Sequence, residues 1–284
     1  YMKILILGAT GLLGQHLFVG LKTYNNQVFG TIRDLGKKSL FLIDRRNDLI
    51  NLKNALDISE LEKVVDEFEI DTVINCISIS NIKEQPKSTL YTVYTNVPIE
   101  ISQLCSRKKI RVVQISTDGV FSGVKGNYTE KDITDPTDAY GHAKLMGELK
   151  GPNQITLRLS LIGHDLINKN GLLEWFLSQE HCRGYSKYIF SGLTTNELTR
   201  IIRDYIFKKP SLYGLYNVSG YPISKYDLFK LIAEKYNLKT TFAKDETIKI
   251  NRVLLSKKFT KDTGYKALAW PRLIDIMKSG DYNL

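Results

Sequence analysis

A glycine-rich turn between a buried strand and a helix is the feature that most constrains the fold of this chain. The apolar run KILILG, residues 3–8, continues into GATGLLG, with glycines at Gly8, Gly11 and Gly14, and then into a helix expected over residues 12–22. Continuous apolar runs are typical of strands buried on both faces of a parallel sheet. Glycines permit a tight turn, close approach to a pyrophosphate and helix-on-strand packing. The pattern predicts a dinucleotide-binding turn.

Strand-like and helix-like segments alternate over the first part of the chain, as in a parallel sheet covered by helices. Further strands are expected over residues 27–33, 54–58, 71–77, 111–117 and 155–163. Helices are expected from Ser59 to about Phe68, with Ser59 and Glu62 as a capping box, within 88–107, and within 135–148.

The alternation loosens beyond Gly163. Helices are expected over 172–179, 194–207 and 224–237, the last capped by Ser224, and a strand over 214–219. We therefore predict an α/β fold: a Rossmann-type doubly wound parallel sheet over residues 2–163 and a smaller C-terminal substrate-binding lobe over 164–284, with some elements returning to the core.

Composition narrows the class of protein. The longest apolar runs are far shorter than the ~20 residues of a membrane helix, so no membrane partner is expected. Tyr1 precedes Met2 and is interpreted as a remnant of tag removal. The cysteines, Cys76, Cys105 and Cys182, form no C-x-x-C pair, which favours a reducing cytoplasm and no metal site.

The net charge of +10 is spread over short basic groups rather than one stripe, and no zinc-finger or RNA-binding signature accompanies it. No nucleic-acid partner is therefore expected. The excess of positive charge fits a solvated lysine-rich surface, part of which can bind a phosphorylated ligand.

The end of the second strand bears on the cofactor. In dinucleotide-binding folds an acidic residue there binds the ribose 2′-hydroxyl, whereas an arginine accommodates a 2′-phosphate. Here Arg33 is followed by Asp34. Because arginine comes first, NADP(H) is preferred and NAD(H) also fits.

A tyrosine precedes a lysine by four residues in the segment YGHAK, at Tyr140 and Lys144. Carbonyl reduction needs an acid for the developing alkoxide, a hydroxyl that holds the oxygen, and a cation that lowers the phenol pKa from about 10. Tyr140, Thr117 and Lys144 can supply these roles. The same spacing recurs at Tyr205/Lys209, Tyr221/Lys225 and Tyr226/Lys230, but without the glycine turn and hydroxyl-bearing strand, and these pairs are expected on the surface.

Three segments together, GATGLLG, STDGVFSG and YGHAK, resemble the extended short-chain dehydrogenase/reductases. The form STD-x-VF is most similar to the dTDP-4-dehydrorhamnose reductase branch, and the similarity extends through LRLSLIG, GLYNVSG and LSKKFTKDTGY. The resemblance implies an NADPH-dependent oxidoreductase. It would transfer hydride to C4 of a nucleotide-linked 4-keto-6-deoxy sugar in surface polysaccharide precursor synthesis, with a nucleotide-diphosphate sugar as its ligand and a homodimer as one assembly.

The resemblance also implies site residues. The cofactor contacts it implies are Gly8, Thr10, Gly11, Leu12 and Leu13 at the pyrophosphate, Asp57 and Ile58 at the adenine, Cys76, Ile77 and Ser78 along the cofactor, and Asn96, Tyr140 and Lys144. The substrate contacts are Thr117, Asp118 and Arg252. Roles as a small core residue for Cys76 and as a buried amide for Asn96 fit equally well.

One departure bears on the reaction. Related dehydratases have a glutamate base after the Thr-Asp pair, and this chain has Gly119, so elimination of water lacks its base. Reductase relatives commonly have tyrosine there, so Gly119 leaves extra room beside the sugar. Two alternatives stay open: a nucleotide-sugar C4 epimerase, and a non-catalytic NADP-binding subunit similar to the regulatory subunit of methionine adenosyltransferase.

Overall fold

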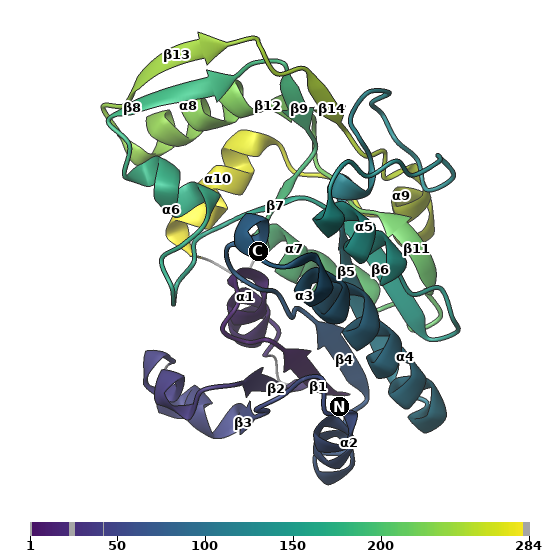
Figure 1. Ribbon diagram of the computed structural model, residues 1–284. Coiled ribbons are helices and arrows are strands. Elements are labelled where there is room, and N and C mark those ends of the chain that lie inside the picture. The colour runs from purple at the N-terminus through teal and green to yellow at the C-terminus, as the bar shows by residue number, and fades with distance from the viewer. Residues whose placement is uncertain (1, 23–25, 42, 281–284) are drawn as a thin grey trace. The chain divides into compact units, whose positions relative to one another are not determined.

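Parallel strands around β1 form the centre of the fold. The computed structural model describes residues 2–22, 26–41 and 43–280, so Tyr1 lies outside the described residues. In parallel pairs, β1 (Met2–Leu7) joins β2 (Asn26–Ile32) and β4 (Thr72–Asn75), β2 joins β3 (Leu49–Asn51), and β4 joins β5 (Arg111–Thr117). With β6 (Gln154–Leu159) and β11 (Gly214–Asn217), the strand order in the described residues is β11-β6-β5-β4-β1-β2-β3 (Figure 1). This order reverses between β1 and β4, as in a Rossmann sheet, and confirms the predicted fold class.

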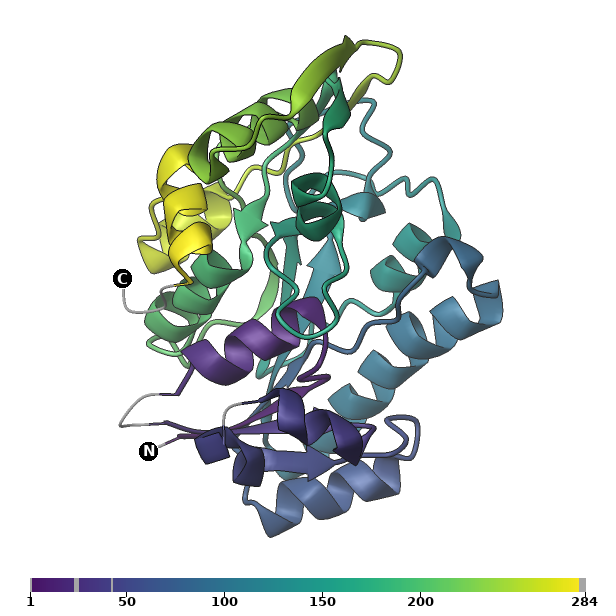
Figure 2. The ribbon, with the colours of Figure 1, turned by 90° about the vertical axis from the view of Figure 1, so that its left-hand side faces the viewer.

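Helices cover both faces of the strands around β1. They are α1 (Leu12–Gly20), α2 (Ile58–Glu67), α3 (Lys87–Tyr91), α4 (Val97–Lys108) and α5 (Ala139–Met146). Leu5 and Leu7 of β1 pack in one buried cluster with residues of α2 and α4. Figure 2 shows α1 on the opposite side of β1 and β2 from α2. A Cβ at Gly30 of β2 would lie 2.8 Å from Phe18 of α1, so this glycine lets α1 pack closely.

Two predicted boundaries were wrong. The strand expected over residues 54–58 is a turn, in which the Asp57 amide donates to the Asn54 carbonyl, and β3 lies earlier, at Leu49–Asn51. Helix α2 begins after Asp57, whose side chain caps it by accepting from the Ser59 amide at 3.0 Å. An Asx cap two residues before Ser59 therefore replaced the predicted capping box, because Asp57 reaches the first free amide.

The helix expected within 88–107 is interrupted. Between α3 and α4 the residues Thr92–Asn96 form a π-helical turn, which holds one more residue per turn than an α-helix. The extra residue changes which side chains face α5. Tyr94 and Thr95 are buried there, whereas Asn96 is exposed.

The chain divides into two compact units that are interleaved along the sequence. The first unit consists of residues 1–116, 138–157 and 210–215, and the second of 117–137, 158–209 and 216–284. The sequence suggested one boundary at Gly163. Instead the chain passes from one unit to the other after Ser116, Thr137, Leu157, Lys209 and Leu215.

Small sheets and helices make up most of the second unit. Its paired strands are β7 (Leu161–Ile162) with β10 (Leu193–Thr194), β8 (His181–Tyr185) with β13 (Thr241–Asp245), and β9 (Tyr188–Phe190) with β12 (Ile223–Ser224) and β14 (Ile250–Arg252). Its helices are α6 (Leu172–Leu177), α7 (Thr195–Ile201) followed by a π-helical turn over Ile202–Ile206, α8 (Lys225–Tyr236), α9 (Lys257–Thr263) and α10 (Trp270–Ser279). Helices α8 and α10 share its hydrophobic core, and Ser224 caps α8 as predicted.

Candidate active site

The glycine turn between β1 and α1 contains three glycines with different physical requirements. Gly8 has a φ of +83°, and a Cβ there would lie 3.1 Å from the carbonyl oxygen of Cys76. A Cβ at Gly14 would lie 2.1 Å from the carbonyl oxygen of Gly8. Both glycines are therefore required by the packing of the chain itself.

Gly11 differs from these two. Its φ is −78°, and a Cβ there would meet its nearest described protein atoms at 3.4 and 3.7 Å, which are ordinary van der Waals distances. Gly11 is also the N-cap of α1 without a side-chain cap, and Leu12 and Leu13 follow as its first helical residues, whose amides have no acceptor within the helix. Neither backbone conformation nor crowding within the protein requires glycine here. The amides at this helix N-terminus suit an anionic ligand.

At the end of β2, Arg33 and Asp34 have separate surroundings. The Asp34 carboxylate accepts from the Gly36 amide at 2.9 Å and caps a short 3₁₀ turn over Leu35–Leu40. Asn51 donates to the Arg33 carbonyl at 3.1 Å, which holds the backbone. The Arg33 side chain is exposed, and the structure gives its guanidinium no partner among the described residues. This arrangement leaves the arginine, rather than the aspartate, available to a phosphate.

Asp57 and Ile58 lie where β3 leads into α2. The Asp57 carboxylate accepts from both the amide and the hydroxyl of Ser59, at 3.0 and 2.6 Å. These hydrogen bonds hold the pKa of Asp57 below its usual value. Its carboxylate is therefore used for helix capping, and Ile58 remains half-buried beside it.

The segment after β4 lies against the glycine turn. The Cys76 amide donates to the Leu7 carbonyl at 3.1 Å, and the Ile77 amide donates to Asn75 Oδ1 at 3.1 Å. Burial raises the pKa of the Cys76 thiol to about 12, so this sulfur is a neutral, packed group rather than a nucleophile. Ser78 follows and shares a hydrogen bond of 3.0 Å with the hydroxyl of Tyr94.

Tyr140 and Lys144 occupy one face of α5. Asp138 caps this helix by accepting from the Gly141 amide at 2.7 Å. The Lys144 ammonium donates to the Ile115 carbonyl of β5 at 2.6 Å. Burial lowers the pKa of Lys144 to about 8, and the charge of the Glu148 carboxylate opposes that shift. The pKa of this amine therefore lies close to neutral pH. The amine lies beside the same Cys76 that borders the glycine turn.

Tyr94 is a residue of this site that the sequence did not single out. Its ring packs edge-on against Tyr140, with centroids 5.2 Å apart, and the Lys144 ammonium lies 5.1 Å from its centroid. Asn96 is not part of this group, because the π-helical turn exposes its side chain. Thr95 faces α5 instead, and its hydroxyl donates to the Ala143 carbonyl at 2.8 Å.

Thr117, Asp118 and Arg252 belong to the second unit. Thr117 Oγ1 accepts from the Gly119 amide at 3.0 Å and caps a 3₁₀ turn over Asp118–Val120. Arg252 on β14 is in register with Phe190 of β9, and its Nη1 lies 4.0 Å from the Cβ position of Gly119. Burial raises the pKa of Asp118 to about 6, and Arg252 and Lys225 act against that shift. The glycine that departs from the family pattern thus lies beside a guanidinium.

Lys225 is a second residue that the sequence misjudged. The prediction that the other Tyr/Lys pairs are surface residues holds for Lys209 and Lys230, which are exposed, but is wrong for Lys225. Lys225 begins α8 directly after β12, and its ammonium lies 4.1 Å from the centroid of Phe190. Burial lowers its pKa, and Asp118 opposes that shift. The strand order β12-β9-β14 that brings Lys225 near Arg252 is not visible in a local pattern.

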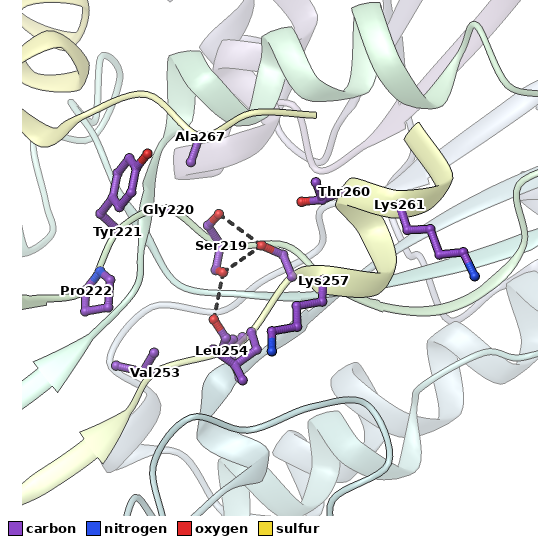
Figure 3. Close-up of a pocket in the computed structure, with 12 residues that line it drawn as sticks. Ser219, Gly220, Tyr221, Pro222, Val253, Leu254, Lys257, Thr260, Lys261 and Ala267 are labelled. Carbon is purple, nitrogen blue, oxygen red and sulfur yellow. Dashed lines mark hydrogen bonds between the residues drawn. The ribbon is translucent and has the colours of Figure 1, made fainter. Parts of the chain in front are cut away.

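A surface pocket of about 460 Å³ also lies in the second unit. It is formed by the segments after β11 and β14, and Figure 3 shows Ser219 and Lys257 among its lining residues. Ser219 donates to the Leu254 carbonyl at 2.8 Å and contacts the Ser256 hydroxyl at 3.0 Å. None of the predicted site residues lines this pocket.

Across the part of the chain that the structure describes, no helix is long and apolar enough to cross a membrane. Within the same residues, no group of three or more His, Cys, Asp and Glu side chains could hold a metal ion. Cys76, Cys105 and Cys182 are buried free thiols.

Comparisons with known proteins relate these features to a family. A probable low-salt glycan biosynthesis reductase of Haloferax volcanii is 29% identical over 57% of this chain, and the chain spans about half, 54%, of that relative's length. The methionine adenosyltransferase 2 subunit beta of Danio rerio is 23% identical over 84% of this chain and 75% of its own.

The structure of a dTDP-4-dehydrorhamnose reductase of Bacillus anthracis, in complex with NADP, superposes with a TM-score of 0.80 at 20% identity, covering 99% of each chain. At this identity the likeness shows the fold. The family model described as RmlD substrate binding domain matches residues 2–178, more than half of the chain. The protein therefore belongs to the RmlD substrate binding domain family.

Proposed function

We propose that this protein is an NADPH-dependent reductase that converts the C4 carbonyl of a nucleotide-linked 4-keto-6-deoxy sugar to a hydroxyl, in the synthesis of surface polysaccharide precursors. One observation supports this most. Within the first unit, Tyr140 and Lys144 adjoin Tyr94, and the buried Lys144 ammonium lies near Cys76, whose carbonyl borders Gly8 and Gly11. An acid and a cation thus meet the dinucleotide turn at the place where the strand order reverses.

The residues present fit NADPH. The first amides of α1, at Leu12 and Leu13, suit a pyrophosphate, with Gly8, Thr10 and Gly11 in the same turn, and Arg33 suits a 2′-phosphate. Asp57 and Ile58 would border the adenine, and Cys76, Ile77 and Ser78 would border the nicotinamide half. When bound, the cofactor supplies the hydride.

The chain's own residues supply the proton. As the carbonyl carbon accepts hydride, its oxygen gains negative charge, and the Tyr140 hydroxyl donates a proton to it, giving the alcohol and a phenolate. The Lys144 ammonium favours that phenolate by its charge. Tyr140 regains its proton from solvent after each turnover.

The second unit provides cations for an anionic substrate. Arg252 Nε is buried without a described hydrogen-bond partner, and the structure gives Lys225 no carboxylate within 4.0 Å among the described residues. If Arg252 and Lys225 were engaged in structural ion pairs, neither cation would be available to a ligand. We infer that Arg252 and Lys225, whose charges both act on Asp118, bind an oxyanion of the nucleotide sugar, and that Gly119 leaves the guanidinium accessible.

The deciding experiment is turnover of a panel of dTDP-, UDP- and GDP-linked 4-keto-6-deoxy sugars with NADPH. Tyr140→Phe keeps the ring and removes the acid, so kcat should fall about 10²–10⁴-fold with little change in substrate KM. Tyr205→Phe, Tyr221→Phe and Tyr226→Phe are matched controls and should retain turnover within a few-fold. A near-normal rate for Tyr140→Phe contradicts the mechanism.

The match to a methionine adenosyltransferase subunit over 84% of the chain favours one other function, a non-catalytic NADP-binding subunit. A stoichiometric partner in pull-downs, together with no sugar reduction by wild type, would support it. A C4 epimerase would instead copurify with tightly bound cofactor and interconvert two sugars without net consumption of NADPH.

A further inference from the structure

Tyr94 connects three parts of the first unit. Its ring is 2% exposed and lies on the π-helical turn Thr92–Asn96, which is held against α5 at two points. Thr95 donates to the Ala143 carbonyl at 2.8 Å, and a Cβ at Gly147 would lie 1.9 Å from the Tyr94 carbonyl oxygen. π-helical turns inside α-helices are frequent at functional sites. Here the inserted residue turns Tyr94 toward α5 and fixes its backbone there.

The ring of Tyr94 contacts both members of the Tyr-Lys pair. It meets Tyr140 nearly perpendicularly, at 87° with centroids 5.2 Å apart, and its face lies 5.1 Å from the Lys144 ammonium. A T-shaped contact restricts the orientation of the Tyr140 ring. An aromatic face near an ammonium favours the charged amine, which burial otherwise disfavours.

The hydroxyl of Tyr94 has a different task. It lies 3.0 Å from Ser78 Oγ and accepts from the Ile79 amide at 3.2 Å. These residues follow β4, directly after the Cys76 carbonyl that borders the glycine turn. One side chain thus touches the acid and the cation through its ring and fixes the Ser78–Ile79 backbone through its oxygen.

We propose that Tyr94 is a positioning residue with two separable roles: its ring orients Tyr140 and keeps Lys144 charged, and its hydroxyl holds the Ser78–Ile79 segment in the form that receives the cofactor. This inference rests on the proposed function for its catalytic consequences. The physical contacts can be tested without turnover.

Two variants separate the roles. Tyr94→Phe keeps the ring and loses the oxygen, so NADPH affinity should weaken about 3- to 10-fold, as expected for one or two neutral hydrogen bonds, with kcat within about twofold. Tyr94→Met fills most of the space without an aromatic face, so kcat should fall by at least about tenfold. Because the charged amine loses its aromatic contact, the Lys144 pKa should fall by about 0.5–1 unit.

The Lys144 titration is measured by NMR of ¹³C-methylated lysines in the folded protein, which needs no substrate. Among the described residues, the titratable groups that act on Lys144 are Cys76 and Glu148, and both are unchanged in the two variants. Tyr216→Phe and Tyr216→Met are matched controls. Tyr216 is 4% exposed, has Lys258 3.8 Å from its ring and donates to Asp262 at 2.9 Å, and its variants should alter neither the Lys144 titration nor NADPH affinity.

The outcomes are distinct. If Tyr94→Met leaves the Lys144 midpoint in place, the ring role is wrong, and if Tyr94→Phe binds NADPH as wild type does, the hydroxyl role is wrong. If Tyr94→Met does not fold, Tyr94→Leu, which also lacks an aromatic face, should lower the Lys144 pKa by a similar amount, and an unchanged Lys144 midpoint in that variant counts against the ring role. A wild type that reduces no 4-keto sugar contradicts the proposed function and leaves the titration test intact.

Discussion

Gly11 and Gly14 occupy one turn, yet substitution by alanine should affect different properties of the protein. In Gly14→Ala the new methyl would lie 2.1 Å from the Gly8 carbonyl oxygen, a backbone atom, so the turn must shift. Overpacking of this kind costs about 1–3 kcal/mol. At about 2–4 °C per kcal/mol, the melting temperature should fall by about 2–12 °C.

In Gly11→Ala the methyl meets described protein atoms no closer than 3.4 Å. Alanine is a poorer N-cap than glycine by about 0.5–1 kcal/mol. It also restricts the unfolded chain, which stabilises the fold by about 0.4–1 kcal/mol where φ is compatible. The two effects nearly cancel, so Gly11→Ala should melt within about 2 °C of wild type.

Cofactor affinity should show the opposite pattern. A methyl at Gly11 projects toward the position assigned to the pyrophosphate. Loss of one hydrogen bond from a backbone amide to a charged group costs about 1.5–3 kcal/mol, or about 10- to 150-fold in NADPH affinity. Calorimetric titration and thermal melting of wild type, Gly11→Ala and Gly14→Ala decide the matter. Unchanged NADPH affinity in a well-folded Gly11→Ala would refute the assignment of this turn.

Three further outcomes are expected. Arg33→Ala should reduce the preference for NADPH over NADH, and equal affinity of wild type for both cofactors would contradict the assigned 2′-phosphate contact. Because burial lowers the pKa of Lys144 to about 8, NADPH affinity should be constant below pH 8 and fall above it as the ammonium loses its proton. Lys144→Met should remove this fall in NADPH affinity above pH 8. If the fall persists in that variant, it comes from the titration of another group. Lys225→Met and Arg252→Met should each raise the KM for a nucleotide-diphosphate sugar more than they lower kcat, whereas the same change at the exposed Lys230 should alter neither.

The sequence predicted the parts of the fold that are encoded locally. The apolar runs of β1, β2 and β5 and the serine cap of α8 appear in the structure close to their expected bounds. Strand β8, by contrast, pairs with β13, with His181 opposite Thr241 and Tyr185 opposite Asp245, so each strand is supported by a partner about 60 residues away in sequence. Short strands paired at such separation leave little periodic pattern to detect.

The candidate site divides in the same way. Glycine spacing and the Tyr140/Lys144 spacing are visible in a single sequence, because each lies within one turn or one helix. Tyr94 is hidden, because LYTVYTNV reads as an uninterrupted helix and an inserted π-helical residue has no sequence signature of its own. Lys225 is hidden because its nearness to Arg252 depends on the order of three strands from distant parts of the chain.

The interleaving of the two units limits how this protein can acquire new specificity. Residues of the second unit come from 117–137, 158–209 and 216–284, so no single crossover in the gene exchanges that unit intact. Recombination between relatives would bring together segments that had not adapted to each other's packing. A new substrate specificity is therefore expected to arise by point substitutions within the existing framework, at positions such as Gly119, rather than by exchange of the whole second unit.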